Sequence, residues 1–75
     1  MKLPIRNYTD KPLGLFIEPM GNEYDIPPGG EAIVVLVDGH PHSVDVHEGL
    51  VAVWNEGPEP VAVTVRATQA SIGRR

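Results

Sequence analysis

Three histidines close together are the residues of this sequence most suited to chemistry. His40 and His42 flank a single proline, and His47 follows shortly after them. A His-x-His pair in extended backbone places both imidazoles on the same side, which suits zinc, copper or iron. The pair resembles the metal motif of cupins, but Glu48 lies too far along the chain and Val34 replaces the motif's glycine. Cupins are also longer proteins, so the match fails.

The local sequence favours solvated loop histidines over a metal centre. Pro41 suits a loop better than a strand, and His47 would have to fold back to join the other two histidines. We therefore expect neither a metal site nor a cofactor. The alternative is a small ligand- or metal-binding β module that uses His40, His42 and His47.

Acidic side chains near the middle of the chain are a second candidate for chemistry: Glu18, Glu23, Asp25 and Glu31. Catalysis by paired carboxylates needs one carboxyl pKa to be displaced by burial or by a close neighbour. These residues fall in expected turns and strand ends, where carboxylates are normally solvated. We therefore expect a solvated acidic rim.

The sequence offers no convincing nucleophile or phosphate loop. It contains no cysteine, and Ser43 beside His42 has no strand-to-helix elbow around it. Gly29 and Gly30 precede an expected strand, whereas phosphate-binding loops lead into the N-terminus of a helix. We expect no catalytic residue, and a protein that is not an enzyme.

The length of 75 residues allows one domain, which we expect to span residues 1–66, with a polar, basic tail over residues 67–75. So short a chain buries only about 60% of its unfolded surface. Without cysteine it has no disulfides, and small domains of this kind often gain stability by oligomerising or by docking on a larger body. The lack of cysteine also fits a cytoplasmic protein.

Charge is unevenly distributed along the chain, whose net charge is −4. All ten acidic residues lie within residues 1–65, and the last ten residues contain Arg66, Arg74 and Arg75 without any acid. The acidic body lacks the basic stripe of a nucleic-acid-binding protein. No apolar stretch approaches the ~20 residues of a membrane span, and the N-terminus does not resemble a signal peptide. We expect a soluble protein with no nucleic acid or membrane partner.

The strand pattern is organised around the turn Pro27-Pro28-Gly29-Gly30. Pro28 presets the φ of the second position of a type II turn, and Gly29 accepts the positive φ that follows. The apolar run 31–37 comes next and predicts a strand buried on both faces. Pro4 confines the first strand to a sheet edge.

Further strands are expected at 3–8, 13–18, 24–26, 44–47, 50–54 and 61–66, with a tight hairpin at Glu48-Gly49. In the strand 13–18, Leu13, Leu15 and Ile17 should face the core. About six or seven short strands without a helix predict an all-β fold, a compact antiparallel β-sandwich or a small barrel. An α/β fold is excluded, because parallel strands need crossover helices.

The stretches 7–13, 17–24 and 26–30 resemble small β-sandwich proteins of bacteria and their phages. Those proteins have an Asn/Thr turn, a Leu-rich strand, a Glu-Pro-x-Gly step and a Pro-Gly turn. The group has no assigned activity, so the resemblance implies a β-sandwich and no site.

Two expected strands, 31–37 and 50–54, are apolar on both faces. A two-layer sandwich buries only one face of each sheet, so we expect an uncovered patch that contacts protein. Trp54 is expected in the core, with an interface hot spot as the alternative. The interface candidates are Phe16, Ile33, Val35, Val37, Trp54, Arg74 and Arg75.

The expected function follows from this patch. We expect a structural or accessory protein that contacts a protein partner, or further copies of itself, in a larger assembly. By analogy of fold and through the resemblance, a phage capsid decoration or minor capsid protein is the most specific example. Such a protein would lie in the cytoplasm, or in the virion if it derives from a phage. The arginine tail is expected to be a frayed terminus, with docking to an acidic neighbour as the alternative.

Overall fold

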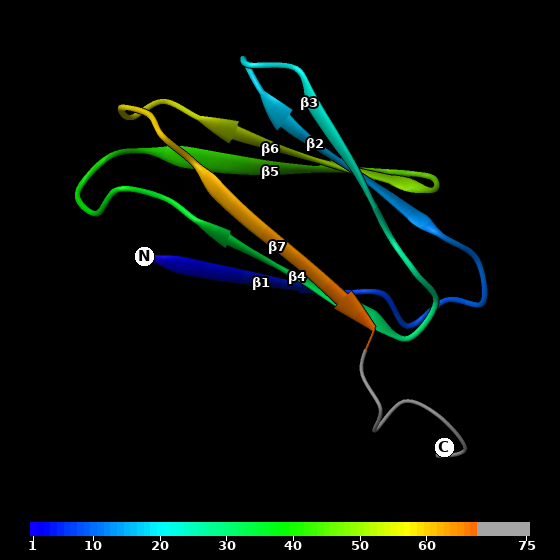
Figure 1. The fold of residues 1–75 in the computed structure, drawn as a ribbon. Coiled ribbons are helices and arrows are strands. Elements are labelled where there is room, and N and C mark those ends of the chain that lie inside the picture. Colours follow the sequence, from blue (N-terminus) through cyan, green and yellow to red (C-terminus); the bar gives the residue numbers. More distant parts are fainter. Residues whose placement is uncertain (68–75) are drawn as a thin grey trace.

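Two β-sheets packed face to face form the fold in the computed structural model, which describes residues 1–67 (Figure 1). A three-stranded sheet has the order β1-β4-β7, and a four-stranded sheet has the order β3-β2-β6-β5. The strands are β1 (Lys2–Arg6), β2 (Leu13–Glu18), β3 (Asn22–Ile26), β4 (Gly30–Val35), β5 (His42–His47), β6 (Leu50–Asn55) and β7 (Ala62–Ala67). The predicted all-β sandwich is confirmed, and within residues 1–67 the sheets do not close into a barrel.

Local signals located most of the strands correctly. β2 has the predicted bounds, and β1 is an edge strand, as Pro4 requires. Glu48 and Gly49 form the predicted hairpin between β5 and β6, and Gly49 has a φ of 76°. Gly29, with a φ of 75°, has the predicted positive φ.

One strand pairing departs from the antiparallel expectation. β2 and β6 pair in parallel, with Leu15 opposite Val51 and Ile17 opposite Val53, whereas the other four pairings are antiparallel. Between these two strands the chain crosses to the other sheet, forms β4, and returns through β5. The connection between the two parallel strands therefore runs through a strand of the opposite sheet, and not through a helix as the sequence analysis assumed.

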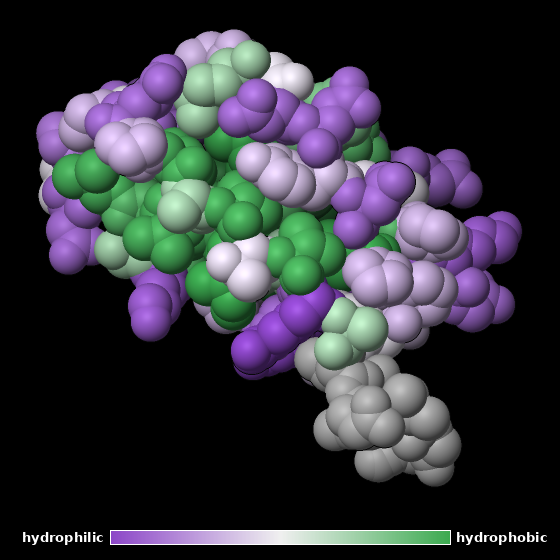
Figure 2. Space-filling model, in the orientation of Figure 1, coloured by the Kyte–Doolittle hydropathy of each residue, from purple (hydrophilic) through white to green (hydrophobic). Residues whose placement is uncertain are grey.

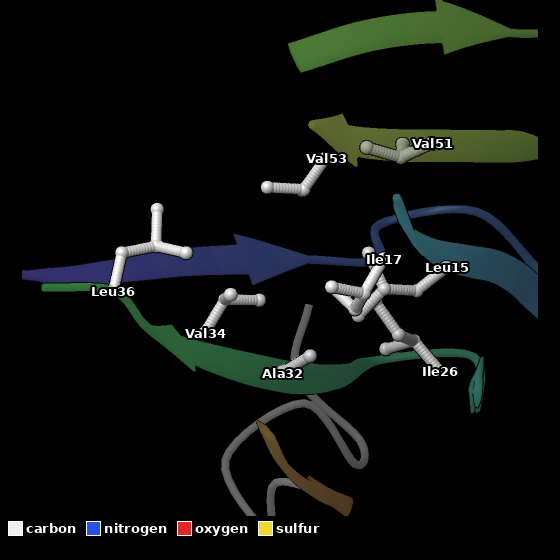
Figure 3. Close-up of a cluster of buried hydrophobic side chains, with 8 residues drawn as sticks. All are labelled: Leu15, Ile17, Ile26, Ala32, Val34, Leu36, Val51 and Val53. Atoms are coloured by element: carbon white, nitrogen blue, oxygen red, sulfur yellow. The ribbon is translucent and has the colours of Figure 1, made fainter. Parts of the chain in front are cut away.

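The core fills the space between the two sheets (Figure 3). Alternation along each strand sends every second side chain inward, and β2 does so with Leu15 and Ile17 as predicted. Burial of one such aliphatic side chain is worth about 1.5–3 kcal/mol. The buried cluster is Leu15, Ile17, Ile26, Ala32, Val34, Leu36, Val51 and Val53.

The outer face of the run 31–37 is only partly covered, so the expectation of burial on both faces is wrong at Val35 and Val37. Ala32, Val34 and Leu36 lie in the core, while Val35 and Val37 on the opposite face are 37% and 39% exposed. The reason is that no further layer of residues 1–67 covers the outer side of the three-stranded sheet.

A buried asparagine joins two turns at one end of the sandwich. Asn7 is 1% exposed, and its Nδ2 donates to the carbonyl oxygens of Lys11, Ile26 and Pro27 at 2.7, 3.0 and 3.2 Å. Its Oδ1 accepts from the backbone N–H and the hydroxyl of Thr9 at 2.9 and 2.7 Å. One side chain thus fixes the β1–β2 turn against the β3–β4 turn.

Candidate interaction surfaces

The outer side of the three-stranded sheet presents an apolar surface, which we call the valine face. The register places Ile33 between Pro4 and Thr64, and Val35 between Lys2 and Ala62. Figure 2 shows hydrophobic surface gathered where β7, the neighbour of β4, lies in Figure 1. The valine face comprises Pro4, Ile33, Val35, Val37 and Ala62.

A row of alternating charge borders the valine face at one end. Glu31 lies between Arg6 and Arg66 of the flanking strands. Its Oε1 accepts from Arg66 Nη2 at 3.1 Å and from Nε at 3.3 Å, and its Oε2 lies 3.4 Å from Arg6 Nε. The Glu31 side chain is only 8% exposed, so the prediction of a solvated carboxylate is wrong for this residue. Two arginines from neighbouring strands cover it, while Glu23 and Asp25 are exposed as predicted.

An ion pair lies just past the other end of β4. The amino group of Met1 lies 2.5 Å from Asp38 Oδ1 and donates to the Leu36 carbonyl oxygen at 2.8 Å. The hydrogen bond from this ammonium, together with its positive charge, lowers the pKa of the exposed Asp38.

The lowered pKa predicts a pH-dependent contribution to stability. A carboxylate whose pKa is lower in the folded state stabilises the fold above its ordinary pKa of about 3.9, and this contribution disappears as the pH falls through the lowered value. We expect Asp38→Asn to be less stable than the parent at neutral pH and equally stable in strong acid. Urea unfolding from neutral to acidic pH measures the difference, with the exposed Asp10→Asn as the control. A difference that persists in strong acid would contradict the assignment.

A second apolar surface lies on the outer side of the four-stranded sheet, and we call it the aromatic face. Phe16 of β2 lies opposite Ala52 of β6, and Trp54 projects on the same side. Trp54 is 40% exposed, so its expected core position is wrong. Val51 and Val53 fill the core, and alternation sends Trp54 outward. The aromatic face comprises Phe16, Leu50, Ala52 and Trp54.

Acidic residues flank the aromatic face on both sides. Glu23 of β3 lies opposite Phe16, and Asp45 of β5 lies opposite Ala52. Both are exposed, and neither takes part in the ion pairs found in residues 1–67. The aromatic face is therefore an apolar surface flanked by acidic residues, whereas Lys2, Arg6 and Arg66 lie beside the valine face.

The structure does not bring the three histidines together. His42 and His47 are the first and last residues of β5. His40 lies in the preceding loop, where a Cβ added at Gly57 would be 2.6 Å from the His40 Cβ. Within residues 1–67, no group of three or more His, Cys, Asp or Glu side chains could hold a metal ion.

Sequence reasoning missed two buried asparagines, Asn7 and Asn55. Asn55 accepts the Gly57 N–H at 3.0 Å through Oδ1 and donates to the Gly57 carbonyl oxygen at 3.2 Å, which shapes the β6–β7 loop. The sequence does contain a signal for Asn55, because an asparagine two residues before a turn glycine often forms a hydrogen bond with the backbone of that glycine.

Of the interface candidates, Phe16, Ile33, Val35, Val37 and Trp54 lie on the two faces, whereas Arg74 and Arg75 are outside the described residues. No family model, curated protein or solved structure matches the chain. The resemblance to small bacterial and phage proteins stays a prediction. In the described part of the chain, no helix has the length and apolar character needed to cross a membrane.

Proposed function

We propose that this chain is a non-enzymatic structural or accessory protein that acts through protein–protein contacts in a larger assembly. The supporting observation is the presence of two apolar sheet faces, one on each side of a single small domain. Val35, Val37 and Trp54 are each exposed by more than a third on these faces. Large exposed apolar patches on small domains usually mark contact surfaces.

The physical chemistry of a small domain favours the same role. Assembly would cover the two faces and stabilise the fold by mass action, because partners bind the folded state and not the unfolded one. A phage capsid decoration or minor capsid protein is the specific form we favour, since such modules are small, rich in β-structure and free of disulfides. The site of action would then be the virion, and otherwise the cytoplasm. The separation of the histidines along β5 gives the ligand-binding alternative no support.

Sedimentation of the purified chain over a concentration series tests the role of the faces. We expect an assembly that Trp54→Ser or Val35→Asp weakens at least about tenfold, which is the effect of losing about 1.4 kcal/mol at a contact residue. Trp54 is the only tryptophan, so its emission should also shift to shorter wavelength as the aromatic face becomes covered.

The matched control is Tyr8→Ser, which removes an aromatic ring that is 87% exposed in the β1–β2 turn. It should leave the assembly unchanged. If the parent associates and Trp54→Ser and Val35→Asp sediment like it at every concentration, the two faces do not form the contact between copies and self-assembly through them is refuted. A parent that stays monomeric would direct the search to a different protein as the partner.

A further inference from the structure

The sandwich is closed along one side and open along the other. At the closed side β3 packs against β7, so β1 and β5 are the edge strands of the opposite side. Val44 and Val46 of β5 share the inner face with their partners Val53 and Val51. Those partners are 0% and 7% exposed, yet Val44 is 42% and Val46 77% exposed. Within residues 1–67, the three-stranded sheet does not extend under β5.

The backbone of β5 is also available on this side. The Glu56 N–H donates to the Pro41 carbonyl oxygen at 3.2 Å, next to the pairing of His42 with Asn55. Antiparallel pairing alternates, so the odd-numbered residues of β5 bond to β6. The N–H and C=O groups of the even-numbered residues, His42, Val44 and Val46, therefore point away from the sheet.

The neighbouring edge, β1, is more strongly protected against pairing than β5. Met1 and Leu36 exchange backbone bonds at 2.8 and 2.9 Å, so Lys2, Pro4 and Arg6 present their backbone to the free side of β1. Proline and charged side chains are the usual means of blocking an edge strand. β5 has neither proline nor lysine, and its one acidic side chain, Asp45, lies on the outer face of the sheet. On its inner face, Val44 and Val46 are exposed.

We propose that β5 pairs antiparallel with β5 of a second copy across a two-fold axis, which joins the two four-stranded sheets into one. The free backbone groups belong to the even-numbered residues of β5. In the dimer, each even-numbered residue must therefore lie opposite an even-numbered residue of the second copy. An axis through Asp45 would place two carboxylates directly opposite, which is destabilising. An axis through Val46 would pair Val44 with the Glu48 turn, and an axis through Ser43 would pair Val46 with His40 in the loop before β5. Both would shorten the ladder.

The axis therefore passes through Val44. His42 then pairs with Val46 of the partner subunit, and Asp45 lies opposite Ser43 of the partner subunit. The two Val44 side chains meet on the inner face, each flanked by a Val46. The contact is isologous, the commonest form of homodimer. It is separate from the valine and aromatic faces and leaves both free for the proposed assembly.

A cysteine introduced at the axis tests the register. The chain has no native cysteine. In Val44→Cys the two new thiols belong to one hydrogen-bonded pair with Cα atoms about 5.5 Å apart, within the range that disulfides span. Val37→Cys is the matched control, because Val37 is 39% exposed, but on the valine face. We expect Val44→Cys to form the disulfide-linked dimer at least about tenfold faster under mild oxidation.

A lysine on the edge tests the contact itself. Val46→Lys should weaken dimerisation at least about tenfold in sedimentation equilibrium, since lysine on an edge strand opposes pairing. The monomer should keep its circular dichroism and melting curve, because Val46 is already 77% exposed. Val35→Lys, the corresponding change on the valine face, should leave this dimer intact.

The outcomes separate this proposal from the proposed function. Dimer loss in Val46→Lys but not in Val35→Lys supports strand pairing. Loss in Val35→Lys alone would overturn strand pairing and support association through the valine face. A parent that stays monomeric at all concentrations, or equal cross-linking of Val44→Cys and Val37→Cys, would also overturn it.

Discussion

Replacement of Asn7 by alanine is expected to lower the free energy of unfolding by about 3 kcal/mol. The Asn7 side chain is 1% exposed and supplies the donors for the Lys11, Ile26 and Pro27 carbonyl oxygens. Alanine would leave these oxygens without that donor and would open a cavity between the two turns. A chain of this size has a total stability of only several kcal/mol, so the loss would be severe.

Asn7→Asp separates the hydrogen bonds from the packing. The aspartate side chain has the same shape, but at neutral pH it presents a carboxylate where Nδ2 now donates to the Ile26 carbonyl oxygen at 3.0 Å. The loss of stability should be at least as large as in Asn7→Ala, because the anion is repelled by oxygens that it cannot satisfy. A small effect of Asn7→Asp would show that shape, and not donation, holds the turns together.

Urea unfolding followed through the Trp54 fluorescence measures both variants. Asn22→Ala is the control, since Asn22 is an exposed asparagine at the start of β3, and its effect should stay within about 0.5 kcal/mol. Equal losses for Asn7→Ala and Asn22→Ala would show that the buried network contributes nothing to stability.

Features fixed by neighbouring residues were predictable from the sequence. The period of two placed Leu15 and Ile17 in the core and the valines of β7 on one face, with Ala62, Thr64 and Arg66 on the other. Glycine and proline marked the turns because their backbone preferences act locally. Sheet partners were less accessible. The parallel pairing of β2 with β6 depends on the intervening chain crossing to the other sheet, and no local pattern encodes that path.

For the candidate surfaces too, local features were predictable from the sequence, whereas features that depend on distant residues were not. Apolar residues on both faces of two strands correctly indicated an exposed patch at Val35 and Val37. Periodicity alone could not say which face of β6 is buried, so Trp54 was expected in the core. Glu31 was expected in solvent because its cover comes from Arg6 and Arg66, which lie on other strands. Burial of a charged side chain depends on such distant partners.

Replacement of Gly30 by alanine should lower the free energy of unfolding by about 2–3 kcal/mol through crowding of two strands. Gly30 is buried at the start of β4. A Cβ at this position would lie 2.8 Å from the Arg66 carbonyl oxygen and 2.8 Å from Pro27 Cγ. The first of these atoms belongs to the β7 backbone, so relief of the contact requires the two strands to separate.

Gly14→Ala is the matched control for crowding. Gly14 also lies within a strand, but its nearest neighbour would be Leu50 Cδ1 at 3.2 Å, the tip of a flexible side chain. Its substitution should cost much less than that of Gly30, because a leucine tip can move by a few tenths of an ångström. Urea unfolding compares the two, and equal costs would exclude backbone crowding as the cause at Gly30.

A double-mutant cycle with Glu31→Gln shows whether β7 moves. The amide removes the ion pairs of Glu31 with Arg6 and Arg66. If the alanine at position 30 pushes β7 away from β4, it has already weakened the contact between Arg66 and Glu31. Glu31→Gln should then cost less in the Gly30→Ala background than in the parent, by at least about 0.5 kcal/mol. Additive costs would show that the structure absorbs the methyl group without moving β7, and that Arg66 keeps its position at the border of the valine face.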